Sequence, residues 1–341
     1  MKNYRGSLLL AAISTALGLG SCQKEGMKNT MAGSVMAKPD LTVMPIPALF
    51  WWATLNGPPY RDTVYGDAPS EVSGGLGFSI TGTGFIVGAN PTLYRDYYFD
   101  PQEVWAYDTA AKSWIRKVDF PDITPTGGVS FVIGDNAYVV AAGATWQYNK
   151  PADRWTRKAT TPFAAREWGV GMALNGKGYV GLGDHNGTLL SDWWQYDPTA
   201  DLWTLKRKFP GTARTGAVGF ALYDLGYVTA GYHALNNFPL TTYRYDPVVD
   251  TWTAVASFTG AGREFAVASS ATVNGAQVGL VAGGESTTGS TLADVYEYDP
   301  NKNNWFKMQT GGAGHEFAAG FVVGRAFFDC NLNCSVLCWT K

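Results

Sequence analysis

Four short segments of the chain place a basic side chain at one equivalent position. They read "AAREWGVG", "TARTGAVG", "AGREFAVA" and "AGHEFAAG", and each leads into an apolar stretch typical of a β-strand. A guanidinium stays protonated and binds carboxylates through paired N–H groups, so this set predicts a rim that binds a polar, oxygen-rich and anionic ligand. Arg61, in the long segment "NGPPYRDTVYGDAPSEVSGG", is expected to join it. The aligned residues are Arg166, Arg214, Arg263 and His315.

Carboxylates stand beside three of these basic residues. Glu167, Glu264 and Glu316 follow them directly in sequence, whereas Thr215 takes this place in the second segment. Because arginine does not exchange its proton at neutral pH, acid or base catalysis would fall to the glutamates or to histidine. The further candidates are His185 in "GDHNG", His233 in "GYHALNN", and Trp168, whose ring could stack on a sugar.

The sequence gives weak grounds for a metal or a cofactor. The three histidines would bind zinc only if their loops brought them to the same ion, so we expect no metal site and no cofactor. Cys330, Cys334 and Cys338 are spaced four apart, which fits no familiar zinc or iron–sulfur pattern. In an oxidising compartment two of them could form a disulfide and leave one thiol free, and the sequence does not decide which two.

A repeated motif shows what positions these residues. Five segments carry an aromatic residue, then Asp or Asn, then Trp six residues later. Successive copies are about 50 residues apart, and a period of this length with several strands per unit predicts the blades of a β-propeller. The pairs are Asp108 with Trp114, Asn149 with Trp155, Asp197 with Trp203, Asp246 with Trp252, and Asp299 with Trp305.

Each unit predicts four strands. In residues 170–205 these are "VGMALN", "GYVGLG", "SDWWQYD" and "LWTLK", with Tyr-Asp-Pro in the turn between the last two. The Asp of that turn can accept backbone N–H bonds, and the Trp should pack between blades. Loops alternate between the two faces of an antiparallel blade. The basic loops therefore fall on one face, around the channel, and the Tyr-Asp-Pro hairpins fall on the other.

The Tyr-Asp…Trp hairpins and the Gly-rich ends of the second strands ("AAG", "GLGD", "VTAGY", "VAGGE") resemble the kelch family of β-propellers over about residues 50–341. The resemblance implies an all-β fold, and five motifs with strands left over at both ends predict a six-bladed kelch β-propeller. We expect the sixth blade to take its outer strand from "LFWWATL" and its inner strands from the C-terminal "AAGFVVGRAFFDCNLNCSVLCWTK". Such closure removes an open sheet edge.

The resemblance also bears on the basic rim. Kelch repeats often place arginine in these loops to bond neighbouring loop carbonyls, so a structural role for Arg166, Arg214 and Arg263 is the alternative to ligand binding. Galactose oxidase, a kelch-type propeller, needs a copper site with a cross-linked Tyr–Cys pair, and no cysteine precedes Cys330 in the blades. A copper oxidase is therefore not expected.

The N-terminus resembles the signal of a bacterial lipoprotein. Lys2 and Arg5 flank the start of the chain, and the apolar run "GSLLLAAISTALGLGS" that follows ends at Cys22. The resemblance implies a cleaved signal peptide over 1–21, lipidation of Cys22, and anchoring to the bacterial outer membrane, on its periplasmic or its outer side. Residues 22–45 have no hydrophobic period and predict a flexible tether, which leaves 46–341 for the propeller.

Three functions fit these features. The first is a lipid-anchored, monomeric module that binds a carbohydrate or an envelope protein on its blade-to-blade loop face. The second is a cofactor-free sugar mutarotase or epimerase, because the chain resembles the N-acetylneuraminate epimerases; arginines would hold the sugar carboxylate, and glutamates such as Glu167 and Glu264 would transfer protons. The third is a scaffold for protein assembly. A net charge of −2, with acids and bases mixed along the chain, argues against a nucleic-acid partner.

Overall fold

The computed structural model of the chain describes residues 50–56, 74–88, 102–109, 111–122, 127–234, 237–308, 314–330 and 333–339. Every regular element in these ranges is a β-strand, and the strands form six four-stranded antiparallel sheets and two short two-stranded ones. Within the same ranges there is no helix that is long and apolar enough to cross a membrane.

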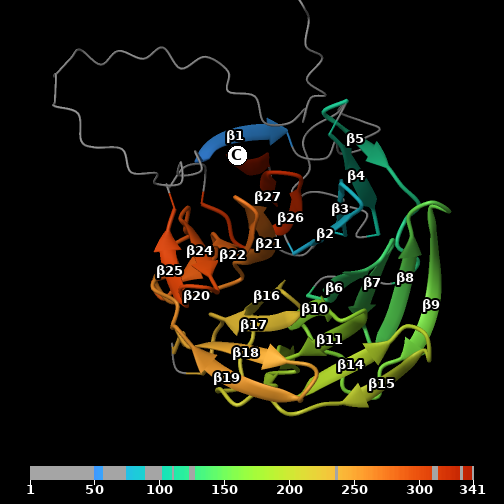
Figure 1. Cartoon of the computed structure of the whole chain (residues 1–341). Coiled ribbons are helices and arrows are strands. Elements are labelled where there is room, and N and C mark those ends of the chain that lie inside the picture. The colour runs from blue at the N-terminus through green and yellow to red at the C-terminus, as the bar shows by residue number, and fades with distance from the viewer. Residues whose placement is uncertain are drawn as a thin grey trace, which may run out of the picture.

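Five of the larger sheets are built from strands in chain order, with the first strand innermost (Figure 1). The first sheet comprises β2 (Leu76–Ile80), β3 (Thr83–Val87), β4 (Val104–Asp108) and β5 (Ser113–Arg116). The second comprises β6 (Val129–Ile133), β7 (Asn136–Ala141), β8 (Ala144–Asn149) and β9 (Arg154–Thr160). The third comprises β10 (Val170–Leu174), β11 (Lys177–Gly181), β14 (Trp193–Asp197) and β15 (Leu202–Leu205).

The fourth sheet comprises β16 (Val218–Leu222), β17 (Leu225–Thr229), β18 (Thr242–Asp246) and β19 (Thr251–Val255). The fifth comprises β21 (Val267–Val273), β22 (Ala276–Ala282), β24 (Val295–Asp299) and β25 (Asn304–Lys307). The two short sheets lie in the loops, and they pair β12 (Asp184–His185) with β13 (Thr188–Leu189), and β20 (Arg263–Glu264) with β23 (Glu285–Ser286).

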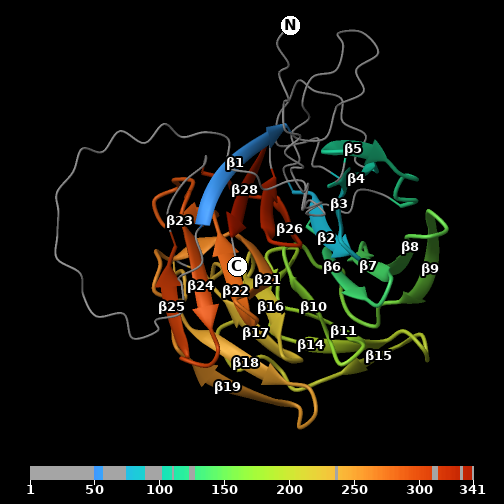
Figure 2. The same ribbon diagram turned by 45° about the horizontal axis from the view of Figure 1, so that its top comes forward.

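The sixth sheet joins the two ends of the described chain. Its inner strands are β26 (Ala319–Val323), β27 (Ala326–Cys330) and β28 (Asn333–Trp339), and its outer strand is β1 (Phe50–Asn56). β1 pairs with β28 over its whole length, from Phe50 opposite Trp339 to Asn56 opposite Asn333, and Figure 2 shows the two strands side by side. The described part of the predicted segment, "FWWATL", therefore forms the outer edge strand of this sheet.

The innermost strands of the six sheets surround a central axis (Figure 1). Each contacts the next in the order β2, β6, β10, β16, β21 and β26, and β26 contacts β2 again, so the ring is closed. The prediction of an all-β propeller is confirmed. Glycine permits the close approach at the axis, because any side chain at Gly77 of β2 would overlap the backbone of Gly320 in β26.

Aromatic residues of the repeated motif fill the space between neighbouring sheets. Tyr196 and Trp203 are both buried, with ring centroids 5.0 Å apart, and they pack with Phe131 and Tyr138 of the preceding sheet. The packing of the motif Trp between sheets follows the sequence prediction. The turn Asp of the same motif also behaves as expected, since Asp197 accepts the backbone N–H of Thr199 at 2.9 Å.

In the second to fifth sheets, the Tyr of the motif fastens the sheet to the one before it. Tyr196 donates its hydroxyl to Asp201 (2.6 Å), and Asp201 accepts the backbone N–H of Ala159 in the preceding sheet (2.9 Å). We call this arrangement the Tyr–Asp staple. The acceptors have φ values between 44° and 51°, which Asp and Asn tolerate better than most side chains. It recurs at Tyr148 with Asp153, Tyr245 with Asp250, and Tyr298 with Asn303.

Candidate functional site

One residue from each inter-sheet loop lines one end of the channel, and its backbone lies in the left-handed region. Five backbone hydrogen bonds of 2.6–3.2 Å join these loops from sheet to sheet, and in each the N–H of one loop donates to the carbonyl of the preceding loop in the ring. We call these residues the mouth ring. They are Gly74 (φ 77°), Gly127 (φ 69°), Trp168 (φ 55°), Gly216 (φ 59°), Phe265 (φ 53°) and Phe317 (φ 52°).

Three aromatic side chains belong to the mouth ring, and we call Trp168, Phe265 and Phe317 the aromatic triad. The Trp168 ring centroid is 5.1 Å from both phenyl rings, and the two phenyl rings stack at 4.0 Å. All three residues are half-buried, so part of each ring faces solvent. A left-handed backbone costs a non-glycine residue roughly 1–2 kcal/mol. The mutual ring contacts offset this cost at three positions where glycine would be less strained.

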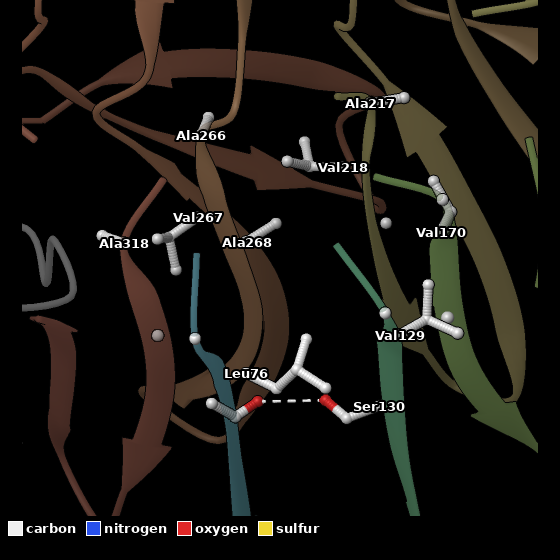
Figure 3. A pocket seen from close by; sticks show the side chains of 17 residues that line it. Leu76, Val129, Ser130, Val170, Ala217, Val218, Ala266, Val267, Ala268 and Ala318 are labelled. Atoms are coloured by element: carbon white, nitrogen blue, oxygen red, sulfur yellow. Dashed lines mark hydrogen bonds between the residues drawn. The ribbon is translucent and has the colours of Figure 1, made fainter. Parts of the chain in front are cut away.

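Behind the triad, the channel holds two adjoining cavities of about 120 and about 200 Å³. The smaller is lined by the triad together with glycines and alanines, and the larger by residues of the innermost strands such as Leu76, Val129 and Val170 (Figure 3). No charged side chain lines either cavity among the described residues. The charged groups of the site therefore lie around the triad and not inside the channel.

Glu264 and Glu316, which immediately precede Phe265 and Phe317 of the triad, form a cluster with Glu285. Glu264 of β20 lies opposite Glu285 of β23, and Glu316 shares a hydrogen bond with Glu285. Burial, reinforced by the charges of Glu285 and Glu316, raises the pKa of Glu264 to about 7. Burial and Glu285 also raise the pKa of Glu316. A carboxyl group that is half-protonated near neutral pH can both donate and accept a proton.

Glu167, the third predicted carboxylate, lies in a different environment. It is exposed, and its backbone pairs with Asp184, with hydrogen bonds of 2.9 Å in both directions. Its side chain is therefore held at the surface next to Trp168, where it can accept hydrogen bonds from a ligand.

The guanidinium groups of Arg166 and Arg263 face away from the mouth. Arg166 forms a two-pronged ion pair with Asp192 (2.7 and 2.8 Å) and donates to the carbonyl of Leu182. Arg263, which is fully buried, donates to Asp294 at 2.7 Å and to the carbonyl of Gly283 at 2.8 Å. These contacts correspond to the structural alternative considered for the basic loops.

Arg214 has the same orientation but different partners. Its side chain is buried and donates to the carbonyls of Ala230 (3.0 Å) and Thr212 (3.1 Å). Its remaining nitrogen, Nη2, lies 3.3 Å from the hydroxyls of Thr212 and Thr241. Each of the three guanidinium groups is thus bound by its own set of neighbouring side chains and carbonyls.

The histidines lie in the loops on this face, as the topology predicts. The Nδ1 atoms of His185 and His233 lie 2.6 and 2.7 Å from the carbonyl oxygens of Ala165 and Ala213. His315 is buried, and its carbonyl accepts the N–H of Gly284 at 2.6 Å. Over the described residues, no group of three His, Cys, Asp or Glu side chains is placed to hold a metal ion.

Several predicted features lie outside the described residues. These are Arg61 of the rim, the lipidation residue Cys22, and the signal and tether segments 1–21 and 22–45. At the other end of the chain, Cys330 is disulfide-bonded, and Cys334 lies opposite it in the β27–β28 pair.

Sequence reasoning recognised only one member of the aromatic triad. The loops read "REW", "REF" and "HEF", so an aromatic residue follows the carboxylate in three of the four aligned segments. This regularity could have shown that the third position, and not the first, faces the channel. The acids that pair with the arginines, Asp192 and Asp294, each directly precede a third strand, and no local pattern links them to residues so far away in sequence.

The comparisons with known proteins establish the fold and nothing finer. No family model and no curated protein matches the chain. Among solved structures, one titled "Structure of YjhT" matches with a TM-score of 0.64 and 15% sequence identity, over 79% of this chain and 95% of that one. Structural similarity at such low sequence identity shows only that the two proteins share a fold, and it agrees with the propeller described above.

Proposed function

We propose that this protein binds a carbohydrate on its inter-sheet loop face, with the aromatic triad at the centre of the site. The observation that carries the proposal is the triad itself: three half-exposed rings, strained at the backbone, gathered at the mouth of the channel. The apolar face of a pyranose packs well on aromatic rings, while its hydroxyls donate to nearby acceptors. Glu167, Glu264 and Glu316 supply such acceptors beside each ring.

The charge around the triad narrows the ligand class. Arg166 and Arg263 are paired with Asp192 and Asp294, and the charged groups clustered beside the two phenyl rings of the triad are the carboxyl groups of Glu264, Glu285 and Glu316. An acidic sugar would meet repulsion there, whereas a neutral sugar or an amino sugar would not. The ligand we propose is therefore neutral or cationic, in place of the anionic ligand expected from the sequence.

Replacing Trp168 with glycine tests the site with little disturbance of the backbone. Glycine already occupies the equivalent positions 74, 127 and 216 with the same left-handed conformation, so Trp168→Gly removes the ring and relieves strain. Loss of a central aromatic contact typically costs about 2 kcal/mol or more, which is a fall in affinity of about 30-fold. A glycan array that carries neutral, amino and acidic sugars first identifies the ligands. Isothermal titration calorimetry then measures the affinity of each variant for them.

The matched control is Val249→Ser on the opposite face. Val249 is 61% exposed in the hairpin between β18 and β19, so its replacement should leave both folding and binding unchanged. If Val249→Ser lowers affinity and Trp168→Gly does not, the ligand binds on the hairpin face. Binding of acidic glycans alone would contradict the charge argument.

The pKa of Glu264 favours a second candidate function, a cofactor-free sugar mutarotase. Opening and closing a sugar ring requires an acid and a base, and Glu264 and Glu316 both have raised pKa values at one site. The rate of anomer exchange, followed by NMR, should then rise above the spontaneous rate in the presence of the wild-type protein. The Glu264→Gln variant should accelerate the exchange less. Glycan binding without any acceleration of anomer exchange would leave the binding module as the function.

We propose further that the six sheets are the blades of a kelch propeller and that Cys22 anchors a monomer to the outer membrane. The five copies of the motif, four with Tyr-Asp and one with Tyr-Asn before the Trp, support the kelch assignment, and the "LGSC" sequence supports lipidation at Cys22. Labelling with radioactive palmitate should mark the wild-type chain and not Cys22→Ser, and the label should fractionate with outer membranes. Release of both forms as equally soluble proteins would refute the anchor.

A further inference from the structure

Three arginines occupy equivalent positions in successive sheets, and one of them lacks the acid that neutralises the other two. Arg166 and Arg263 each pair with an aspartate that directly precedes the third strand of the sheet, Asp192 before β14 and Asp294 before β24. The residue before β18 is Thr241, so Arg214 has a hydroxyl where the others have a carboxylate. Among the described residues, Arg214 has no ion-pair partner, although it is only 1% exposed.

A buried cation without a counterion is unfavourable, because the protein replaces water poorly as a solvent for charge. Burial lowers the pKa of Arg214 to about 10, so it stays protonated at neutral pH. The ring of Phe209, 5.1 Å from the guanidinium carbon, and the carbonyls of Ala230 and Thr212 compensate part of the charge. None of these groups carries a negative charge, so the surroundings of Arg214 keep a net positive charge, unlike those of Arg166 and Arg263 in the two neighbouring sheets.

The geometry around Arg214 leaves donors that point to a counterion from solution. Nη2 contacts the oxygens of both Thr212 and Thr241 at 3.3 Å, so each hydroxyl accepts from the guanidinium and keeps its own hydrogen to donate. Both threonines are exposed. A threonine hydroxyl is attached directly to Cβ and stops one bond short of the position that aspartate oxygens reach. Two exposed hydroxyl groups, each with a hydrogen left to donate, therefore lie within 3.3 Å of the same nitrogen of a buried cation.

We propose that Thr212 and Thr241 form a binding site for one small monovalent anion, a halide ion or a carboxylate group, which neutralises Arg214. The anion accepts one hydrogen bond from each hydroxyl, and it takes the electrostatic place of Asp192 and Asp294 in the neighbouring sheets. This site is independent of the proposed carbohydrate site, because Arg214 and both threonines lie outside the aromatic triad and its carboxylates.

The test compares wild type with Thr241→Asp, which builds the ion pair found in the two neighbouring sheets. Thermal unfolding of the full chain is recorded with increasing sodium chloride and, separately, sodium acetate. A ligand that binds only the folded state raises the Tm with its concentration. We expect a saturable rise of a few degrees in wild type, a higher Tm at low salt in Thr241→Asp, and no saturable rise in that variant. A response in chloride alone assigns the site to a halide, and one in acetate to a carboxylate group.

Two further measurements keep the result unambiguous. Thr241→Val keeps the shape of the side chain but removes one donor, so it should abolish the saturable rise without raising the Tm at low salt. Crystals grown in sodium bromide should show an anomalous peak within hydrogen-bonding distance of both hydroxyls in wild type and none in Thr241→Asp. Equal salt responses in wild type and Thr241→Asp, or no bromide peak in wild type, would overturn the proposal.

Discussion

Asp201 offers a sharp test of how the sheets are joined, because the chain contains its own control. Asp201 accepts the hydroxyl of Tyr196 and the backbone N–H of Ala159. The fifth sheet has Asn303 at the equivalent position, with the same two contacts at 2.8 and 2.9 Å. Asp201→Ala should therefore break the staple, whereas Asp201→Asn should preserve it.

The expected cost of Asp201→Ala follows from three changes. The buried Tyr196 hydroxyl loses its partner, which costs about 1–3 kcal/mol, and the Ala159 N–H loses a bond to a charged acceptor. Alanine also tolerates a φ of 50° less well than Asp or Asn. Together these changes amount to roughly 3–5 kcal/mol. The ion pair of Asp201 with Lys158, at 3.6 Å on the surface, adds little.

Differential scanning fluorimetry of the three proteins provides the measurement. At about 2 °C per kcal/mol for a domain of this size, Asp201→Ala should lower the Tm by roughly 6–10 °C, and Asp201→Asn by less than about 2 °C. Equal losses in both variants would show that the negative charge, and not the hydrogen-bond geometry, joins the sheets. A negligible loss in Asp201→Ala would show that the staple does not stabilise the ring.

Three more outcomes are expected. Trp203→Ala removes a buried side chain that packs between two sheets and should cost ~3–5 kcal/mol without a specific loss of glycan binding; an intact Tm with lost binding would contradict its scaffold role. Deleting residues 1–45 should leave the Tm unchanged, whereas deleting residues 1–55 removes nearly all of β1 and should lower it; identical melting curves would mean that β1 does not contribute to closing the ring. The pKa of Glu264 is raised from an unfolded value of about 4.3, so its charged form is disfavoured in the fold, and stability falls as the pH rises from about 4 to 7. Glu264→Gln should remove that fall, so the variant should have a higher free energy of unfolding than wild type at pH 8 but not at pH 4. Urea titrations at both pH values measure this difference, and a variant that is less stable than wild type at pH 8 would contradict the argument.

The architecture could be predicted from the sequence because its determinants are local and repeated. The Asp and Trp of each hairpin lie six residues apart, and the turn that joins them needs no distant partner, so five copies were enough to identify the unit. The position of "LFWWATL" followed from counting strands, since a closed ring leaves no other place for an unpaired edge.

The candidate site could be predicted only in part, because its contacts are not local. Arg166 and Arg263 were aligned correctly, but the orientation of their side chains depends on Asp192 and Asp294, 26 and 31 residues further along the chain. The aromatic triad is likewise assembled from three different loops. A left-handed backbone at Trp168, Phe265 and Phe317 decides which residue of each loop faces the channel. Aromatic residues seldom adopt this conformation, so it cannot be predicted from their backbone propensities.

The pairing of β1 with β28 has a consequence for how the protein is made. β1 and β28 are the first and last strands of the described residues, so β1 meets its partner only after residues 333–339 have been synthesised. Until then β1 is an exposed edge that can pair with other chains, and contacts between such distant segments form slowly. Ring closure should therefore be a late, post-translational step in folding. Aggregation of newly made protein should increase with the time between the synthesis of β1 and its pairing with β28. A chaperone that binds this strand in the interval would raise the yield of folded protein.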